Sequence, residues 1–219
     1  MTRRKWIALG VLGAGMCLAA LAAVGQALWL QAEDAKRDTW QRPNEVMDEL
    51  GVHAESVVAD VGAGRGYFTF RLAARVGPGG RVYAVEIDEG RVAEIRRKAE
   101  REGTRQIELI HGATDDPRLP AETLDAILVV NTYHEMREYE AMLRGMFRAL
   151  KPGGLLGIID EAAPQGRPRS VYHQNHELPK EMVREDAARI GFHYVREPLG
   201  FQTADGENWY FLIFSKPTS

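Results

Sequence analysis

Glycine and carboxylate residues gather directly after an apolar run near residue 60. The run ends in Asp60, and every second position after it is a glycine, at Gly62, Gly64 and Gly66. Glycine adopts positive φ without strain and lets a ligand approach main-chain N–H groups closely. A helix that begins at once would add the positive end of its dipole. The spacing therefore predicts a ligand-binding loop rather than a plain strand–helix turn.

The ligand that this loop predicts is a nucleoside without phosphates. A dinucleotide loop needs a small residue at position 67, where this chain has Tyr67, and the Gly-Lys-Ser/Thr of a phosphate loop is absent. Tyr67 thus argues against an NAD-dependent oxidoreductase, and Asp60 would repel a pyrophosphate. Glu86 ends the next apolar run, at close to the ~20-residue spacing expected for a carboxylate that binds ribose hydroxyls.

Titratable side chains also follow the apolar run 124–130. Asn131 comes directly after it and is expected to contact the ligand, and Tyr133, His134 and Glu135 are the candidate catalytic residues. An imidazole with a pKa of about 6.5 suits a general base. The alternative is a histidine whose nitrogens are satisfied by local hydrogen bonds.

A second group of polar residues lies between residues 165 and 177. His173, His176 and Glu177 could face a metal, but contact near the substrate is the favoured interpretation and no metal site is predicted. Cys17 is the only cysteine, which excludes cysteine-based metal sites and internal disulfides. Arg167 and Arg169 fit either an anionic substrate or a solvated loop.

Apolar strands alternate with amphipathic helices around these groups. This alternation predicts an α/β fold: a doubly wound, mostly parallel seven-stranded sheet with a C-terminal antiparallel hairpin. In such a sheet, ligands lie beyond the carboxyl ends of the strands where the strand order reverses. The predicted strands are 56–61, 81–87, 107–110, 124–130, 155–160, 192–197 and 209–214. The predicted helices are 44–50, 68–76, 90–102, 138–150 and 179–190.

Four segments together give a resemblance to a known family. "VADVGAGRGYFTFRLA", "VYAVEID", "LDAILVVNTYHEM" and "LKPGGLLGIID" resemble motifs of the class I S-adenosylmethionine-dependent methyltransferases, and the resemblance covers residues 39–216. It implies the strand order 3-2-1-4-5-7-6 and S-adenosyl-L-methionine as cofactor. It also places Asp60 and the three glycines at the methionine end of that cofactor and Glu86 at the ribose.

One position departs from the family pattern. The family often has an acid one residue past a glycine after the third strand, in contact with the adenine amino group. Here Ala113 follows Gly112, and Asp115, two residues later, is the candidate for that contact.

The resemblance implies a methyltransferase with a small-molecule acceptor. "Asn-Thr-Tyr-His" differs from the "Asn-Pro-Pro-Tyr" that similar enzymes use on amino groups of bases, and a net charge of −3 gives no basic stripe, so no nucleic-acid partner is expected. The alternative is a noncatalytic, membrane-anchored protein that binds S-adenosylmethionine. The oligomeric state is left open.

The N-terminus has a different character from the rest of the chain. Arg3, Arg4 and Lys5 precede an apolar run from Trp6 to Leu30, long enough to cross a hydrocarbon core as a helix. Residues 1–31 are therefore expected to be a membrane anchor or an export signal, and 32–219 the methyltransferase domain. The predicted location is at the membrane, or outside it after export, with the side of the membrane left open.

Overall fold

The computed structural model describes residues 25, 29, 32–198, 201–202 and 208–218. The chain divides into two units, Met1–Arg42 and Pro43–Ser219. In the first unit, residues 32–41 are helical. Among the described residues no helix combines the length and the apolar character needed to cross a membrane. Most of the predicted anchor or signal lies outside the described residues, so its role stays a prediction.

The strands of the second unit form one sheet. Its order is β3-β2-β1-β4-β5-β8-β6, and β7 pairs with β8 off this path. The strands are β1 (Val57–Val61), β2 (Arg81–Glu86), β3 (Ile107–His111), β4 (Leu124–Val130), β5 (Leu150–Glu161), β6 (His193–Arg196), β7 (Phe201–Gln202) and β8 (Asn208–Ser215). The predicted order is confirmed, with β8 as the seventh strand, antiparallel to both β5 and β6. The two-residue β7 was not predicted.

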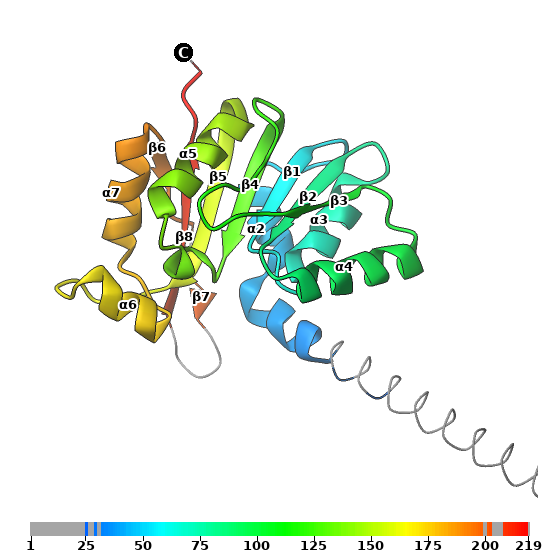
Figure 1. The fold of residues 1–219 in the computed structure, drawn as a ribbon, viewed down its shortest axis with the longest axis horizontal. Coiled ribbons are helices and arrows are strands. Elements are labelled where there is room, and N and C mark those ends of the chain that lie inside the picture. Colours follow the sequence, from blue (N-terminus) through cyan, green and yellow to red (C-terminus); the bar gives the residue numbers. More distant parts are fainter. Residues whose placement is uncertain (1–24, 26–28, 30–31, 199–200, 203–207, 219) are drawn as a thin grey trace, which may run out of the picture. The chain divides into compact units, whose positions relative to one another are not determined.

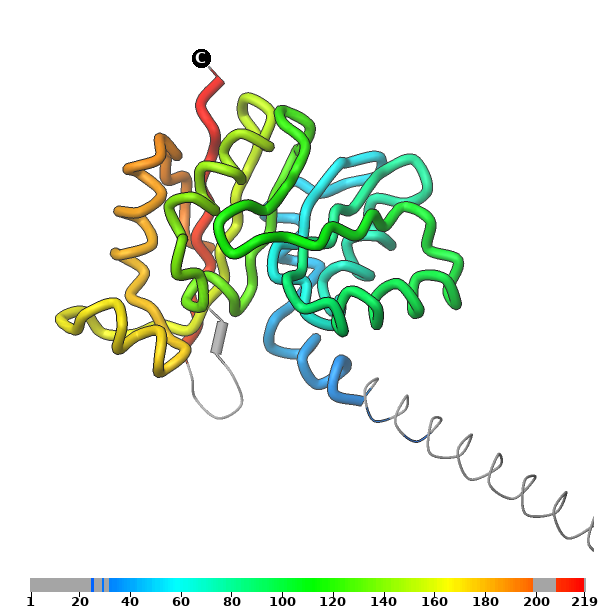
Figure 2. Tube along the Cα trace, viewed as in Figure 1, coloured from blue at the N-terminus to red at the C-terminus, as the bar shows by residue number. Residues whose placement is uncertain are grey.

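Helices cover both faces of this sheet (Figure 1). The helices are α2 (Pro43–Glu49), α3 (Tyr67–Val76), α4 (Glu89–Glu102), η1 (a 3₁₀ turn, Tyr133–Glu135), α5 (Tyr139–Ala149), α6 (Arg169–Asn175) and α7 (Lys180–Ile190). The helix α3 packs on β1 and β2, and α4 packs on β2 and β3. The helices α5 and α7 pack on each other beside β5 and β8. Figure 2 traces the chain from β3 at the sheet edge back to β4 in the centre.

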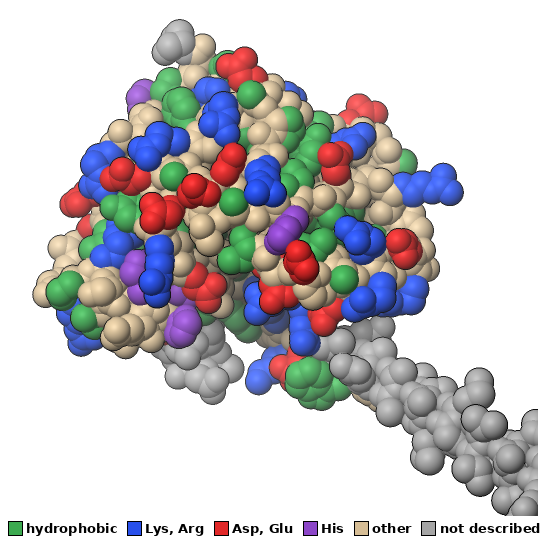
Figure 3. Space-filling view, viewed as in Figure 1, with side chains coloured by type: hydrophobic (Ala, Val, Ile, Leu, Met, Phe, Trp, Pro, Cys, Tyr) green, Lys and Arg blue, Asp and Glu red, His purple; other side chains and the backbone are tan. Residues whose placement is uncertain are grey.

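Nearly continuous apolar runs explain why the central strands are buried. Every residue of β4 except Asp125 is buried, and the five buried positions of β2 run from Val82 to Glu86. Such runs suit strands covered on both faces. On the surface, acidic and basic side chains are interspersed on the face shown in Figure 3.

Two parts of the fold differ from the sequence prediction. β5 begins at Leu150 rather than 155, because Leu150 pairs with Leu124 before a register shift moves the ladder to Ala126 and Leu155. The Lys-Pro-Gly-Gly segment, expected to end a helix, lies within this bent strand. The helix α6 forms directly after Pro168, where only a loop was predicted.

The packing of α5 generates a stability prediction. Leu143 is fully buried in the main core, so Leu143→Ala leaves a cavity and should lower the free energy of unfolding by about 2–5 kcal/mol. Arg144→Ala on the same helix, at a side chain 58% exposed, should change it by no more than about 0.5 kcal/mol. Urea unfolding followed by circular dichroism measures both. Equal effects would contradict the assigned orientation of α5.

Candidate functional site

The site lies where the strand order reverses, between β1 and β4. The two strands pair in parallel, so both carboxyl ends point to the same edge. A side chain added at Gly62, which has φ 80°, would overlap Thr132 in the loop after β4. The glycine loop and the loop after β4 are therefore in direct contact, as expected for a ligand site at a switch point.

Glu86 joins the glycine loop to the end of β2. Its carboxylate accepts hydrogen bonds from the main-chain N–H groups of Gly64 (2.7 Å), Ile87 (2.8 Å) and Asp88 (3.0 Å). The side chain is only 5% exposed, and Arg91 lies 3.9 Å from it. An ionised carboxylate offers about four lone-pair sites, so this one can accept a further hydrogen bond from a ligand hydroxyl.

The loop itself leaves room for a ligand. A Cβ at Gly64, where φ is 58°, would meet nothing within 4 Å. Asp60 is buried and accepts a 2.6 Å hydrogen bond from the Thr69 hydroxyl of α3, which fixes the strand–helix turn. Gly66 has left-handed backbone directly before α3. An open glycine surface beside a buried carboxylate is compatible with the predicted cofactor, and the assignment of Glu86 to the ribose stays a prediction.

Two other predicted contacts lie in exposed positions. Asn131 has φ 51°, an unusual backbone for a residue other than glycine, and its N–H donates to Ile159 in β5. Such backbone is frequent at functional sites. Asp115 is exposed in the loop after β3. Both assignments stay predictions.

His134 is held in place by a buried carboxylate. The Nδ1 atom lies 2.7 Å from Asp160 Oδ1, and the His134 main-chain N–H donates to Asp160 Oδ2 at 3.0 Å. Because the carboxylate accepts, Nδ1 carries the proton in the neutral ring and the Nε2 lone pair is available. His134 is 1% exposed and Asp160 fully buried.

The charges around His134 raise its pKa above the ordinary 6.5. Burial alone would lower it, but the hydrogen bond that Nδ1 donates to Asp160 and the negative charges of Asp160, Glu135 and Glu161 outweigh that effect. The sequence placed Asp160 at the end of the neighbouring strand β5 but did not show that it pairs with His134.

Tyr133 turns to a different carboxylate. Its hydroxyl donates to Asp186 of α7 at 3.0 Å, and Arg169 and Arg189 both pair with the same buried carboxylate. Burial, and then the charge of Asp186, raises the pKa of Tyr133 well above its ordinary value of 10. The Tyr133 hydroxyl is thus engaged in a hydrogen bond that links η1 to α7, and its expected catalytic role stays a prediction.

The other polar residues named in the sequence analysis do not form one cluster but pair with different partners. Arg169 pairs with Asp186 and Arg167 lies 3.6 Å from Glu177. Glu135 is 58% exposed and lies beside His176, whose position near His134 the sequence gave no means of finding.

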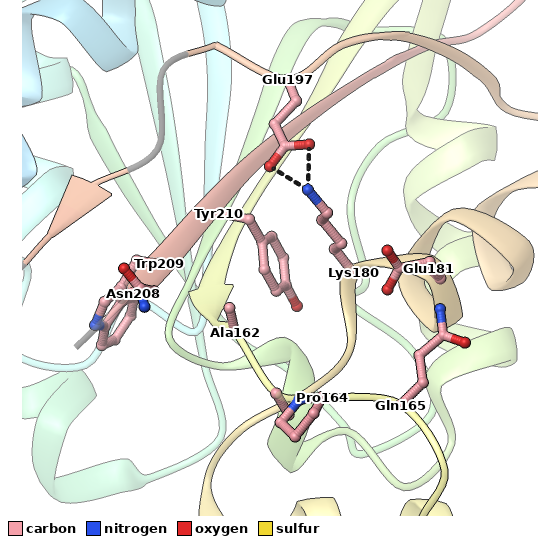
Figure 4. Close-up of a pocket in the computed structure, with 10 residues that line it drawn as sticks. Ala162, Pro164, Gln165, Lys180, Glu181, Glu197, Asn208, Trp209 and Tyr210 are labelled. Carbon is pink, nitrogen blue, oxygen red and sulfur yellow. Dashed lines mark hydrogen bonds and ion pairs between the residues drawn. The ribbon is translucent and has the colours of Figure 1, made fainter.

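A cavity of about 370 Å³ opens at the carboxyl end of β5. Lys180 and Glu197 pair on one side of it, and the Tyr210 hydroxyl points into it from β8 (Figure 4). This buried hydroxyl has no hydrogen-bond partner among the described residues. The cavity is therefore a candidate space for part of an acceptor.

The raised pKa of His134 gives a testable pH dependence. The midpoint of the His134 ring titration, followed by NMR in a buffer with a chelator that removes metal ions, should lie above 6.5. The reason is that the surrounding carboxylates favour the protonated ring. The protonated His134 ring, paired with these carboxylates, stabilises the folded protein. This stabilisation is fully present below the pKa of His134 in the unfolded chain and is lost as pH rises through its pKa in the folded protein. Asp160→Asn should lower the midpoint. A wild-type midpoint at or below 6.5 would contradict the assignment.

Comparisons with known proteins agree with this geometry. Residues 58–154 match the family model of the methyltransferase domain. A demethylmenaquinone methyltransferase from Listeria welshimeri is 30% identical over 125 residues, which are 57% of this chain and 52% of the relative. The chain thus spans about half the length of the curated relatives it matches.

Solved structures extend the similarity over most of the chain. An S-adenosylmethionine-dependent methyltransferase from Aquifex aeolicus is 25% identical, with a TM-score of 0.65 over 78% of this chain and 88% of that one. A phosphoethanolamine N-methyltransferase from Haemonchus contortus, solved with S-adenosylmethionine, is 15% identical, with a TM-score of 0.67 over 81% and 53%. Residues 58–154 thus match a methyltransferase domain, and the chain has the Rossmann-like, class I fold of the S-adenosylmethionine-dependent methyltransferases that it resembles.

Proposed function

We propose that this protein transfers the methyl group of S-adenosylmethionine to a small-molecule acceptor. The observation that carries the proposal is the pairing of an open glycine loop with the Glu86 carboxylate, 2.7 Å from the Gly64 nitrogen. When bound, the cofactor supplies a methyl group already activated on a positively charged sulfur. The protein then needs mainly to hold the two reactants close and aligned.

The residues of the loop divide this work between them. Gly64 leaves main-chain surface open for the methionine end, Gly62 lets the loop pack against Thr132, and the buried charge of Asp60 is compatible with a cationic ligand. Glu86 would accept from a ribose hydroxyl with the capacity that three backbone donors leave unused.

The acceptor is proposed to approach from the loop after β4 and the cavity at the end of β5. Asn131 and His134 lie at that end of the sheet, and the Tyr210 hydroxyl faces the cavity. The Listeria relative is named for demethylmenaquinone, but its match covers 57% of this chain, so that quinone is one test acceptor among several.

Labelled methyl transfer tests the proposal. The purified protein would be incubated with methyl-labelled S-adenosylmethionine and either a demethylmenaquinone or a metabolite and membrane extract. Transfer of label to an extractable product supports the proposal. Tight cofactor binding without transfer to any acceptor would instead favour the noncatalytic alternative.

Glu86 should be needed for cofactor affinity. Glu86→Ala removes charge-assisted hydrogen bonds worth about 1.5–3 kcal/mol each and should weaken S-adenosylmethionine binding about tenfold or more. Calorimetry measures the affinity. Glu108→Ala is the matched control, because this glutamate is exposed on β3 and paired with Arg81. Unchanged affinity in Glu86→Ala would remove the ribose assignment.

Gly64→Val should abolish binding while the fold survives. The branched side chain would enter the open space of the loop, at a φ that valine rarely adopts. Gly103→Val is the control for backbone strain, since Gly103 has a similar φ of 67° and equally open surroundings at the end of α4. If both variants bind the cofactor normally, the loop does not touch it.

A further inference from the structure

Three side chains of metal-ligand type meet beside the candidate site. His134 and Glu135 belong to η1, and His176 caps the end of α6, 42 positions away along the chain. Within the described part of the chain, these three form the cluster whose ligand atoms all lie within 4.8 Å of one another. Figure 3 shows histidine side chains at the surface around α6.

The separations of the three ligand atoms suit one ion. His134 Nε2 and His176 Nδ1 are 3.2 Å apart, and Glu135 Oε1 lies 3.9 Å from the first and 3.8 Å from the second. The nearest point equidistant from the three atoms lies in their plane, about 2.1 Å from each, which matches Zn–N and Zn–O bond lengths. A hydrogen bond between the two rings with an ion pair to Glu135 would give similar separations, so the metal titration described below decides between the two arrangements.

The surroundings orient His134 for coordination. Asp160 accepts the Nδ1 proton and so directs the Nε2 lone pair toward His176. His173 Nδ1 donates to the main-chain oxygen of His134, which fixes the backbone of the same residue. A buried carboxylate behind a ligating histidine is the usual support of a protein metal site, because it fixes the tautomer and the ring.

We propose that His134, Glu135 and His176 bind a divalent transition-metal ion of the zinc type. Two imidazoles and one carboxylate suit this class, whereas magnesium and calcium prefer sites made wholly of oxygen. An ion with three protein ligands keeps a position open for water or for an oxygen or sulfur of the acceptor. The site opens to solvent, because the side chains of Glu135 and His176 are 58% and 67% exposed.

This inference goes beyond the proposed methyl transfer and changes the role expected for His134. A nitrogen that binds a metal has no lone pair left to act as a general base. The ion, rather than the imidazole, would then polarise the acceptor.

Zinc binding to the full-length chain, purified without an affinity tag and stripped with chelator, tests the proposal. Calorimetric titration with Zn²⁺ should give one saturable site per chain. His176→Asn should weaken it at least about tenfold, because asparagine tolerates the left-handed backbone at this position but lacks the imidazole. His193→Asn is the matched control, since His193 is also exposed but lies on β6.

Glu135→Gln provides a second variant at an exposed position and should also weaken Zn²⁺ binding. No saturable site in the wild-type chain, or equal affinity in wild type and both variants, would overturn the proposal and leave only a hydrogen bond between the histidines. S-adenosylmethionine binding to the stripped chain is measured in parallel. Its loss would count against the methyltransferase function alone, and failure to bind Zn²⁺ would count against the metal site alone.

Discussion

The parallel pairing of β1 with β4 is the constraint on which the rest of the site depends. From this line the sheet is built outward in two opposite directions. The glycine loop and the loop after β4 meet at this line through Gly62 and Thr132, and β2 and β5 add Glu86 and Asp160 from either side.

Two buried carboxylates hold the η1 turn, which follows β4, in place. Consecutive residues of η1 turn to different anions: Tyr133 to Asp186 on α7, and His134 to Asp160 on β5. A buried charge is costly unless it is paired and hydrogen-bonded, and each of these is compensated by donors from separate elements. The short 3₁₀ turn is therefore tied to the sheet and to the helical layer at once, and its side chains have little freedom to reorient.

Most of the fold and the cofactor half of the site could be predicted because their signals are local. Apolar strands, glycine spacing and Glu86 are each readable within a short stretch, and strand β4 was predicted with its observed bounds. The partners of His134 could not be predicted in this way. Asp160 and His176 lie 26 and 42 positions from it, and their meeting depends on the β4–β5 register and on α6, which the sequence predicted as a loop.

The direction of the Tyr133 side chain could not be predicted either. It depends on Asp186, which belongs to the last long helix, and the catalytic role expected from the position after β4 stays a prediction. Sequence position indicates which edge of the sheet a residue reaches. The face to which the side chain turns is decided by packing between distant elements.

The contact between Gly62 and Thr132 has a consequence for how the domain can change over evolutionary time. A larger residue at position 62 overlaps the threonine side chain, so it becomes tolerable only after position 132 has become smaller and the backbone has left its positive φ. The two loops therefore cannot diversify independently. Substitutions at position 62 and in the loop after β4 are therefore coupled.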